Sequence, residues 1–335
     1  MYRRLFSETT DMQKDLKAHV RTAQQAIQLQ HERYTTGSRS ALGQLTRTVP
    51  REYTHRAAVA EVFLTDWKPD GADGFLVSAQ WPRGHSFFGP RAGYQDPLLV
   101  AESVRQTGAL LAHAEFGVPL GHSFLMRKLS YTATPEGLVT DLVPTEVEME
   151  VTCHDLAWRA GRFTGMRYEA ALLRDGRSIG FAEAEFSCLS PEVYQRLRGD
   201  RPTSARPAPG RVADPASVGR TQRSDVVLLE PRGREPRWRL YVDTLHPILF
   251  DHPVDHIPGM VLMEAARQAA QAVHPMPVLA VAMESTFAKY AELDAPCWIE
   301  AEVARPVTEG PALVHVRAVQ NDSTVFAAQV TTWQL

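Results

Sequence analysis

The most constraining feature of this sequence is an internal repeat. Residues 62–88 and 226–250 each contain two strand-like runs joined by a turn, and each segment ends in a histidine followed by a short apolar run. The segments that come next align without gaps and pair the same residue types: Phe88 with Phe250, Glu102 with Glu264, Arg105 with Arg267, and Gln106 with Gln268. Self-similarity of this kind predicts two copies of one structural unit.

Each copy predicts one long helix and an antiparallel sheet. The helical segments, 97–114 and 260–273, are rich in Ala and Leu and are opened by Asp-Pro or Pro-Gly. The strand-like segments are short, β-branched or aromatic, and bounded by turn residues; they are 60–66, 74–81, 145–152, 177–189, 312–320 and 323–333. In 145–152, apolar residues alternate with glutamates, which predicts a sheet with one wet face. An apolar helix followed by a sheet that covers it is an α+β layout.

Changes in composition divide the chain into four segments. Residues 1–45 are polar with a thin apolar stripe, so we expect a helical N-terminal extension rather than a domain. The first unit spans 46–190 and the second spans 222–335. Between them, 191–221 is rich in Pro, Arg, Gly and Ser and predicts a linker. Its arginines either face solvent or bind an acidic partner, and the pattern favours a solvated basic loop.

Composition and charge exclude several classes of protein. The chain has 335 residues, with 36 Lys and Arg against 39 Asp and Glu and a net charge of −3, so no basic excess favours nucleic acid or an anionic membrane. No apolar run approaches the ~20 residues of a membrane helix, and the first residues turn polar too early for a signal peptide. Three widely spaced cysteines predict neither a disulfide framework nor a zinc site. We therefore expect a cytoplasmic protein.

The second helix carries a polar stripe on an otherwise apolar surface. Four polar residues lie within about 100° of one another on it: Glu264, Arg267, Gln268 and Gln271. The first copy repeats three of them as Glu102, Arg105 and Gln106, with Ala109 in the fourth place. Charges on a buried helix are unfavourable unless they form ion pairs or take part in binding or catalysis. Two interpretations stay open: an ion pair that ties the repeats together, or a desolvated carboxylate suited to acid–base chemistry beside a cation that can hold an anion.

The loop before the second helix, 250–260, is the next candidate for chemistry. It places His252, Asp255 and His256 against the helix start. Metal binding is one interpretation, but a third histidine at the spacing of catalytic zinc sites is missing, and we predict no metal. The favoured interpretation is that His256 and the backbone N–H groups near Gly259 meet a substrate carbonyl or phosphate at the helix N-terminus.

These motifs resemble known families. The segment HPILFDHPVDHIPGMVLMEAARQAA is similar to the hotdog-fold signature of the β-hydroxyacyl-ACP dehydratases. Both copies together resemble the AfsA family, tandem hotdog proteins that make γ-butyrolactone and furan-type signalling molecules in actinomycetes. The matching parts are the entry motif (Val49, Pro50, Arg51, His55 and Arg56), the PRGHSFF segment, the first helix and the second loop with its helix. The similarity covers 46–335, and the first loop departs from the pattern at Gly93, Tyr94 and Gln95.

The resemblance implies two tandem hotdog folds that pair as a pseudo-dimer. It also implies transfer of a β-ketoacyl chain from acyl carrier protein to the primary hydroxyl of dihydroxyacetone phosphate, in biosynthesis of a γ-butyrolactone, butenolide or furan signal. For this reaction we expect no cofactor. Glu264 is the candidate base, Arg267 and Arg105 the candidate phosphate ligands, and the N–H groups near Gly259 the candidate oxyanion hole. We expect Glu102 to orient the other half of the site, with Gln268 and His256 as further substrate-binding residues.

Two other functions stay open. Hotdog proteins also act as acyl-thioester dehydratases and thioesterases, because a fold does not fix a function. The arginine beside the glutamate argues against this class, since dehydration of an acyl chain needs no phosphate ligand. The other alternative is a non-catalytic module that binds a butyrolactone in its groove.

Overall fold

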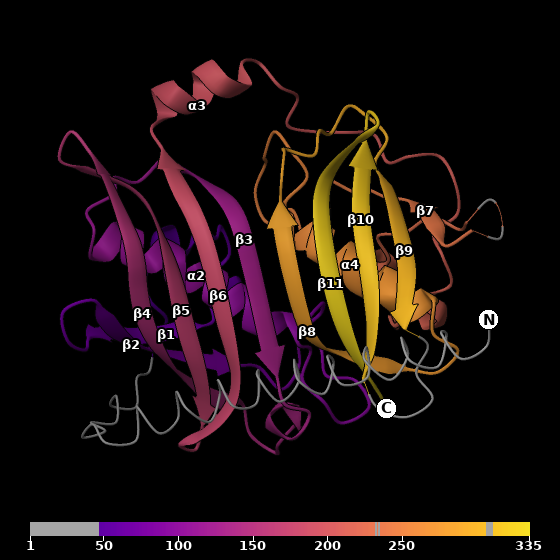
Figure 1. Cartoon of the computed structure of the whole chain (residues 1–335), viewed down its shortest axis with the longest axis horizontal. Coiled ribbons are helices and arrows are strands. Elements are labelled where there is room, and N and C mark those ends of the chain that lie inside the picture. The colour runs from indigo at the N-terminus through magenta and orange to yellow at the C-terminus, as the bar shows by residue number, and fades with distance from the viewer. Residues whose placement is uncertain (1–46, 232, 234, 306–310) are drawn as a thin grey trace, which may run out of the picture.

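Both copies of the repeat contribute to one antiparallel sheet of eleven strands, in the order β1-β2-β4-β5-β6-β3-β8-β11-β10-β9-β7 (Figure 1). The computed structural model describes residues 47–231, 233, 235–305 and 311–335. The helix predicted within 1–45 lies outside the described residues. The six strands of the first unit and the five of the second occupy separate halves of the sheet, so the predicted pseudo-dimer is confirmed.

Each half has one long helix, as the repeat predicts. The first unit contains β1 (Leu64–Pro69), β2 (Gly74–Trp81), α2 (Leu98–Ala114), β3 (Ser123–Ala133), β4 (Thr145–Arg159), β5 (Arg162–Arg174) and β6 (Arg177–Leu189). The second contains β7 (Arg237–Arg239), α4 (Gly259–Ala272), β8 (Val278–Phe287), β9 (Trp298–Arg305), β10 (Ala312–Gln320) and β11 (Ser323–Gln334). Both helices begin and end within one residue of the predicted bounds. The α+β layout is therefore confirmed.

The two halves are joined edge to edge by β3 and β8. Their register runs from Lys128 opposite Thr286 to Thr132 opposite Ala282. The Tyr131 hydroxyl donates to the Ala280 carbonyl at 3.0 Å, which ties the two edges together. Because each edge strand is paired with the other, neither unit leaves an open edge at the junction.

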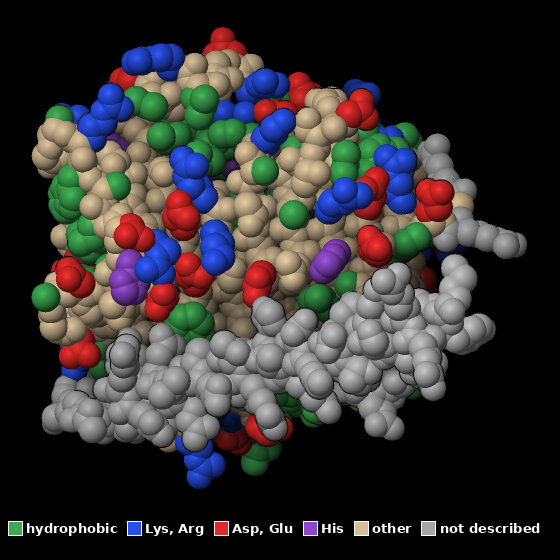
Figure 2. Space-filling model, viewed as in Figure 1, with side chains coloured by type: hydrophobic (Ala, Val, Ile, Leu, Met, Phe, Trp, Pro, Cys, Tyr) green, Lys and Arg blue, Asp and Glu red, His purple; other side chains and the backbone are tan. Residues whose placement is uncertain are grey.

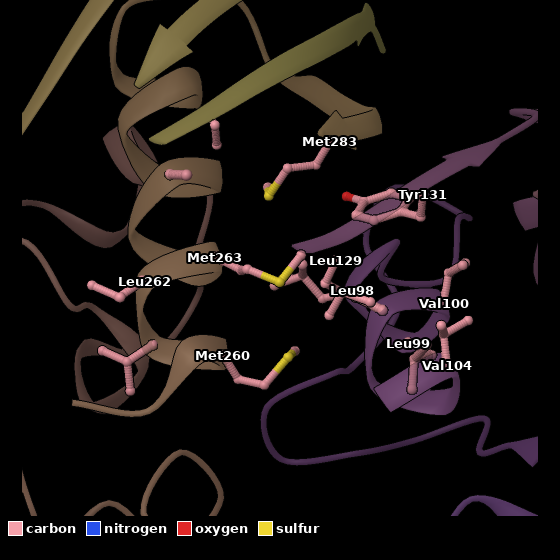
Figure 3. Close-up of a cluster of buried hydrophobic side chains, with 14 of the residues drawn as sticks. Leu98, Leu99, Val100, Val104, Leu129, Tyr131, Met260, Leu262, Met263 and Met283 are labelled. Carbon is pink, nitrogen blue, oxygen red and sulfur yellow. The ribbon is translucent and has the colours of Figure 1, made fainter. Parts of the chain in front are cut away.

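Both helices lie on the same side of the sheet, and their apolar faces form the core between the halves. α2 packs against β3, β5 and β6, and α4 packs against β8 to β11. Figure 3 shows Met263 of α4 pointing toward Leu98 of α2 and Leu129 of β3. The opposite face of the sheet carries acidic and basic side chains that are interspersed (Figure 2), as expected for a sheet with one wet face.

Gly108 allows close packing at the centre of α2. A Cβ at this position would lie 2.5 Å from the Tyr168 hydroxyl oxygen, which is closer than such atoms approach. In its place, the Tyr168 hydroxyl donates to the Val104 carbonyl at 2.6 Å and fixes α2 on β5.

The connection between the units is partly folded. It contains the helix α3 (Pro191–Arg198), which starts at a Ser190 cap, and the short 3-10 turn η4 (Pro215–Val218). The interpretation of this segment as a solvated basic loop is wrong for Arg198 and Arg220, which are only 7% and 5% exposed. Both guanidinium groups are paired with carboxylates inside the protein, so the segment is part of the core at these points.

Candidate active site

The polar stripe of α4 forms a buried charge cluster. Glu264 is fully buried, and its carboxylate accepts hydrogen bonds from Arg267 at 2.7 and 2.8 Å and from Arg220 Nε at 2.8 Å. The Gln268 amide donates to the same carboxylate and to the Asp225 carbonyl, which fixes its orientation. We call Arg220, Glu264, Arg267 and Gln268 the closed cluster.

The closed cluster keeps its carboxylate ionised. Burial alone would raise the pKa of Glu264, but the fields and hydrogen bonds of Arg220 and Arg267 outweigh burial and lower that pKa to about 2. A carboxylate held this far below its ordinary pKa is a weak base. The sequence predicts one arginine beside Glu264. The second guanidinium, that of Arg220, shifts the balance toward a lowered pKa of Glu264.

The stripe of α2 repeats this arrangement. Glu102 is also fully buried, and it accepts from Arg105 at 2.7 and 3.0 Å, from Arg56 Nε at 3.0 Å and from Gln106 at 2.7 Å. Burial raises the pKa of Glu102, but the fields of Arg105 and Arg56 reverse this effect and lower it to about 2. We call Arg56, Glu102, Arg105 and Gln106 the open cluster.

The second arginine of each cluster comes from an equivalent turn. Arg56 follows the 3-10 turn η1 (Arg51–Thr54) and Arg220 follows η4, with one left-handed residue between turn and arginine. Each arginine also reaches into the other unit: Arg56 donates to the Ile248 carbonyl and Arg220 to the Phe87 carbonyl. The sequence expectations do not include Arg220, although an arginine two residues after a short turn in both copies is a usable signal.

The open cluster borders a cavity. The cavity has a volume of about 590 Å³ and lies between the units. Its wall includes Arg56, Arg105 and His55 from the first unit. Apolar side chains of both units complete the wall, among them Phe88, Phe124, Phe250, Met260, Met263 and Phe287. Arg105 is the most accessible arginine of the two clusters, with 21% of its side chain exposed against 7% for Arg267.

The loop before α4 supplies the opposite wall of the cavity. It carries a hydrogen-bonded pair, Asp255 and His256, which we call the dyad. His256 lines the cavity, and its Nδ1 lies 2.7 Å from Asp255 Oδ1. Asp255 is held from α3 by the Tyr194 hydroxyl at 2.5 Å and by Arg198 Nε at 3.0 Å. Burial raises the pKa of Asp255, but its bonds from His256, Tyr194 and Arg198 lower it to about 2, so the carboxylate is ionised and must accept.

The dyad leaves His256 as a neutral imidazole with a free lone pair. Burial lowers the pKa of His256, and the bond to Asp255 only partly reverses this. Since Nδ1 carries the proton toward Asp255, Nε2 keeps its lone pair. This arrangement is suited to accepting a proton at neutral pH.

Comparison with known proteins identifies the family. The chain matches the A-factor biosynthesis hotdog domain, AfsA, over residues 37–190 and 202–335. The chain belongs to the AfsA family. It is 52% identical to a 2-oxo-3-(phosphooxy)propyl 3-oxoalkanoate synthase of Streptomyces virginiae, over 86% of this chain and 98% of the relative. A synthase of the same name from Streptomyces coelicolor is 41% identical over 86% of this chain and 92% of the relative.

Solved structures show the same fold. A protein described as an oleoyl thioesterase from Lactobacillus plantarum matches 79% of this chain and 98% of its own length, with a TM-score of 0.50 and 12% sequence identity. At this identity the likeness concerns the fold alone. It confirms the tandem hotdog architecture of this AfsA-family chain.

The candidate residues of this AfsA-family chain fall into two places. Glu264, Arg267 and Gln268 lie together in the closed cluster, away from the lining of the cavity. Arg105, His256 and Gly259 line the cavity, and Glu102 lies directly behind Arg105. Among the described residues, no three His, Cys, Asp or Glu side chains are grouped as metal ligands. No helix within that part of the chain is long and apolar enough to cross a membrane.

Proposed function

We propose that this AfsA-family protein transfers a β-ketoacyl chain from acyl carrier protein to the primary hydroxyl of dihydroxyacetone phosphate, in the cytoplasm and without a cofactor. The product would be a precursor of a γ-butyrolactone, butenolide or furan signal. The names of the synthases in Streptomyces support this reaction. The observation that carries the proposal is a single cavity in which an apolar wall, an accessible arginine and a histidine–aspartate dyad meet.

In this proposal, His256 is the general base. Its Nε2 takes the proton of the primary hydroxyl while the hydroxyl oxygen attacks the thioester carbon and forms the new C–O bond. The tetrahedral intermediate then breaks its C–S bond, and the departing thiolate takes the proton back from His256. Asp255 stabilises the imidazolium that exists between these two steps, because it is ionised and 2.7 Å from Nδ1.

The start of α4 is the candidate oxyanion hole. Gly259 lines the cavity and is the first residue of α4, and no side chain caps this helix start. The N–H groups of Val261 and Leu262 donate to the Pro258 carbonyl. The earlier N–H groups of the first turn are the ones suited to the thioester oxygen as it gains negative charge.

Arg105 is the candidate phosphate ligand. Arg105 lines the cavity, and its guanidinium donates two hydrogen bonds to Glu102 and one to the Thr54 carbonyl, which hold it in place. A guanidinium that is fixed in this way binds phosphate oxygens with little loss of side-chain entropy. We therefore assign Glu102 the role of positioning Arg105, rather than a part in proton transfer.

The role predicted for Glu264 as base is not part of this proposal. Glu264 is fully buried and neutralised by two arginines, and it is absent from the cavity wall. Arg267 is likewise committed to Glu264. We infer that the closed cluster ties α4 to the linker and to the first unit, which was the structural interpretation of the stripe.

Product analysis tests the reaction. The protein is incubated with a β-ketoacyl thioester on acyl carrier protein, with and without dihydroxyacetone phosphate, and the products are identified by mass spectrometry. We expect a phosphorylated ester that forms only when both substrates are present. Free β-keto acid as the main product would replace the proposal with thioester hydrolysis. Conversion of a β-hydroxyacyl thioester to an enoyl thioester would indicate a dehydratase, and unchanged thioesters throughout would favour a binding module.

A further inference from the structure

Two histidines of the first unit form a hydrogen-bonded pair beside the cavity. His55 Nε2 and His113 Nε2 are 2.7 Å apart. His113 lies in the last turn of α2, is 7% exposed, and has its Nδ1 2.7 Å from the Val118 carbonyl oxygen. Neither residue belongs to the charge clusters or to the dyad.

The contacts of His113 determine where the protons lie. A carbonyl oxygen only accepts, so His113 Nδ1 carries a proton. Burial lowers the pKa of His113, which keeps the ring neutral with a single proton, so its Nε2 is an acceptor. His55 Nε2 must therefore donate to His113. If His55 is neutral, its Nδ1 has no proton and holds a free lone pair.

His55 is neutral because of its surroundings. Burial is the largest cause that lowers its pKa, followed by the field of Arg105, and the pKa falls to about 3. The ring lines the cavity and packs against Phe124, with ring centroids 4.5 Å apart. At neutral pH the side chain is therefore a hydrogen-bond acceptor rather than a cation.

The backbone at His55 is unusual for a residue with a side chain. His55 has φ 54° and ψ 45°, in the left-handed region. The equivalent residue of the second unit, at the same place after η4 and before Arg220, is Gly219 with φ 73° and ψ 34°. Glycine adopts this conformation without steric cost, whereas histidine does not. The turn thus forms with glycine in the second unit, so the backbone itself does not require a histidine here.

We call the unit with the closed cluster the closed half and the unit with the open cluster the open half. In the closed half, another side chain occupies the space next to the turn. A Cβ on Gly219 would lie 2.6 Å from Arg91 Nη1, so the Arg91 guanidinium occupies the space that a side chain would need. In the open half, the side chain at this place is His55, and the space next to it is the cavity. The imidazole therefore lies in the half whose charge cluster borders this cavity.

We propose that His55 is a substrate-binding residue of the cavity, whose Nδ1 accepts a hydrogen bond from an O–H or N–H group of the substrate. The inference rests on the proposed function for the identity of the ligands. The donor is either the hydroxyl of dihydroxyacetone phosphate or an amide N–H of the pantetheine arm that carries the acyl chain.

Three proteins test this inference by calorimetry: the wild type, His55→Gly and His55→Asn. Glycine restores the residue of the second unit and removes the acceptor, whereas asparagine tolerates the left-handed backbone and places an oxygen near the position of Nδ1. Each protein is titrated separately with dihydroxyacetone phosphate and with a non-hydrolysable β-ketoacyl pantetheine. We expect His55→Gly to weaken the binding of one ligand by about tenfold, the effect of one lost hydrogen bond in a buried site, and His55→Asn to stay within about threefold.

The outcomes separate this inference from the proposed function. The ligand that loses affinity in His55→Gly identifies the donor. If His55→Gly binds both ligands as tightly as the wild type does, the role of His55 is overturned and the proposed reaction is unaffected. If the wild type binds neither ligand, the proposed function itself fails. Ring ¹⁵N chemical shifts of the free protein give an independent check: we expect His55 protonated at Nε2 and His113 at Nδ1, and the opposite tautomers would overturn the inference.

Discussion

The two halves of the molecule carry the same buried charge arrangement and differ in what surrounds it. In each half a glutamate of the central helix is held by the arginine three residues later, by a glutamine four residues later and by an arginine from the turn at the entry of the unit. Because the charge arrangement occurs in both halves, we infer that it supports the fold. Chemistry is then expected where the halves differ.

Two differences single out the open half. Its entry turn ends in His55 where the closed half has Gly219. In the gap-free alignment of the repeats, the dyad residues Asp255 and His256 fall opposite Gly93 and Tyr94. The open cluster faces the loop with the dyad, and the closed cluster faces the loop without it. These differences are consistent with an active site built around the open cluster and the dyad.

The largest expected effect is the loss of the base. His256→Asn keeps a donor toward Asp255 and removes the lone pair at Nε2, so we expect transfer to slow by roughly 10²–10⁴-fold. The melting temperature should change little, because the bond to Asp255 is retained. His252→Asn is the matched control, since His252 also lines the cavity but has 46% of its side chain exposed. Equal losses in both variants would contradict the assignment of the dyad.

Neutralising each glutamate compares the clusters directly. Glu264→Gln leaves Arg220 and Arg267 buried without their counter-charge, so we expect a loss of about 3–5 kcal/mol in the free energy of unfolding. Glu102→Gln should cost less stability, because Arg105 is partly exposed to the cavity. It should instead raise the KM for dihydroxyacetone phosphate, because Arg105 is no longer held in place. Urea unfolding and steady-state kinetics on both variants check this, and a larger stability loss in Glu102→Gln would reverse the comparison.

Replacing an arginine by lysine in each half gives a smaller effect. Arg105→Lys substitutes a point charge for a planar fork, so we expect the KM for dihydroxyacetone phosphate to rise about tenfold, equivalent to about 1.4 kcal/mol. Arg267→Lys should leave this KM unchanged and lower thermal stability. The reverse pattern, with the KM effect at Arg267, would return the phosphate to the closed cluster, as the sequence alone suggested.

The smallest effect is a shift in pH dependence. The charged groups that act on the His256 imidazole are Asp255, Arg198 and Glu292. The Tyr290 ring packs against the imidazole, and the Tyr194 hydroxyl donates to Asp255. The Arg198 cation is one of the causes that lower the pKa of His256, so Arg198→Gln should raise that pKa and move the acid limb of the rate profile to higher pH. At pH 8 the rate should change by less than about threefold, because the imidazole is neutral in both proteins.

A matched variant separates this shift from a loss of structure. Arg201→Gln removes another arginine of the same segment that contacts Glu292 but not Asp255. It should leave the acid limb in place. An Arg198→Gln protein with lower stability and an unmoved acid limb would reduce Arg198 to a structural role.

Much of the fold could be predicted because the repeat restricts it. The helix bounds and the alternating strand 145–152 follow from periodicity, and Val147, Met149 and Val151 are buried as expected. The sequence patterns do not predict β3, β5, β8 and β9. Strand β5 includes the helix-favouring run Glu169–Leu173 and is kept extended by its pairing with β4 and β6. The junction between β3 and β8 could not be inferred, since neither strand was recognised.

The site was only partly predictable for a similar reason. The stripe correctly predicted polar clusters on both helices, but the partner arginine Arg220 comes from 44 residues away along the chain. Without Arg220, the sequence suggests a raised pKa for Glu264 and makes Glu264 the candidate base. His256 is then expected only to bind substrate. The gap-free repeat also hides a one-residue shift: His85 and His246 make the same contacts with the backbone that follows them, although the alignment places Pro247 opposite His85.

The location of the phosphate tests the central claim most directly. In a crystal structure of the protein with dihydroxyacetone phosphate, we expect the phosphate against Arg105 in the cavity, with the primary hydroxyl near His256 Nε2 and the start of α4. The closed cluster should be unchanged, with both arginines still on Glu264. A phosphate bound between Arg91 and Arg267, with Arg267 released from Glu264, would contradict the account and place the active site in the other half of the molecule.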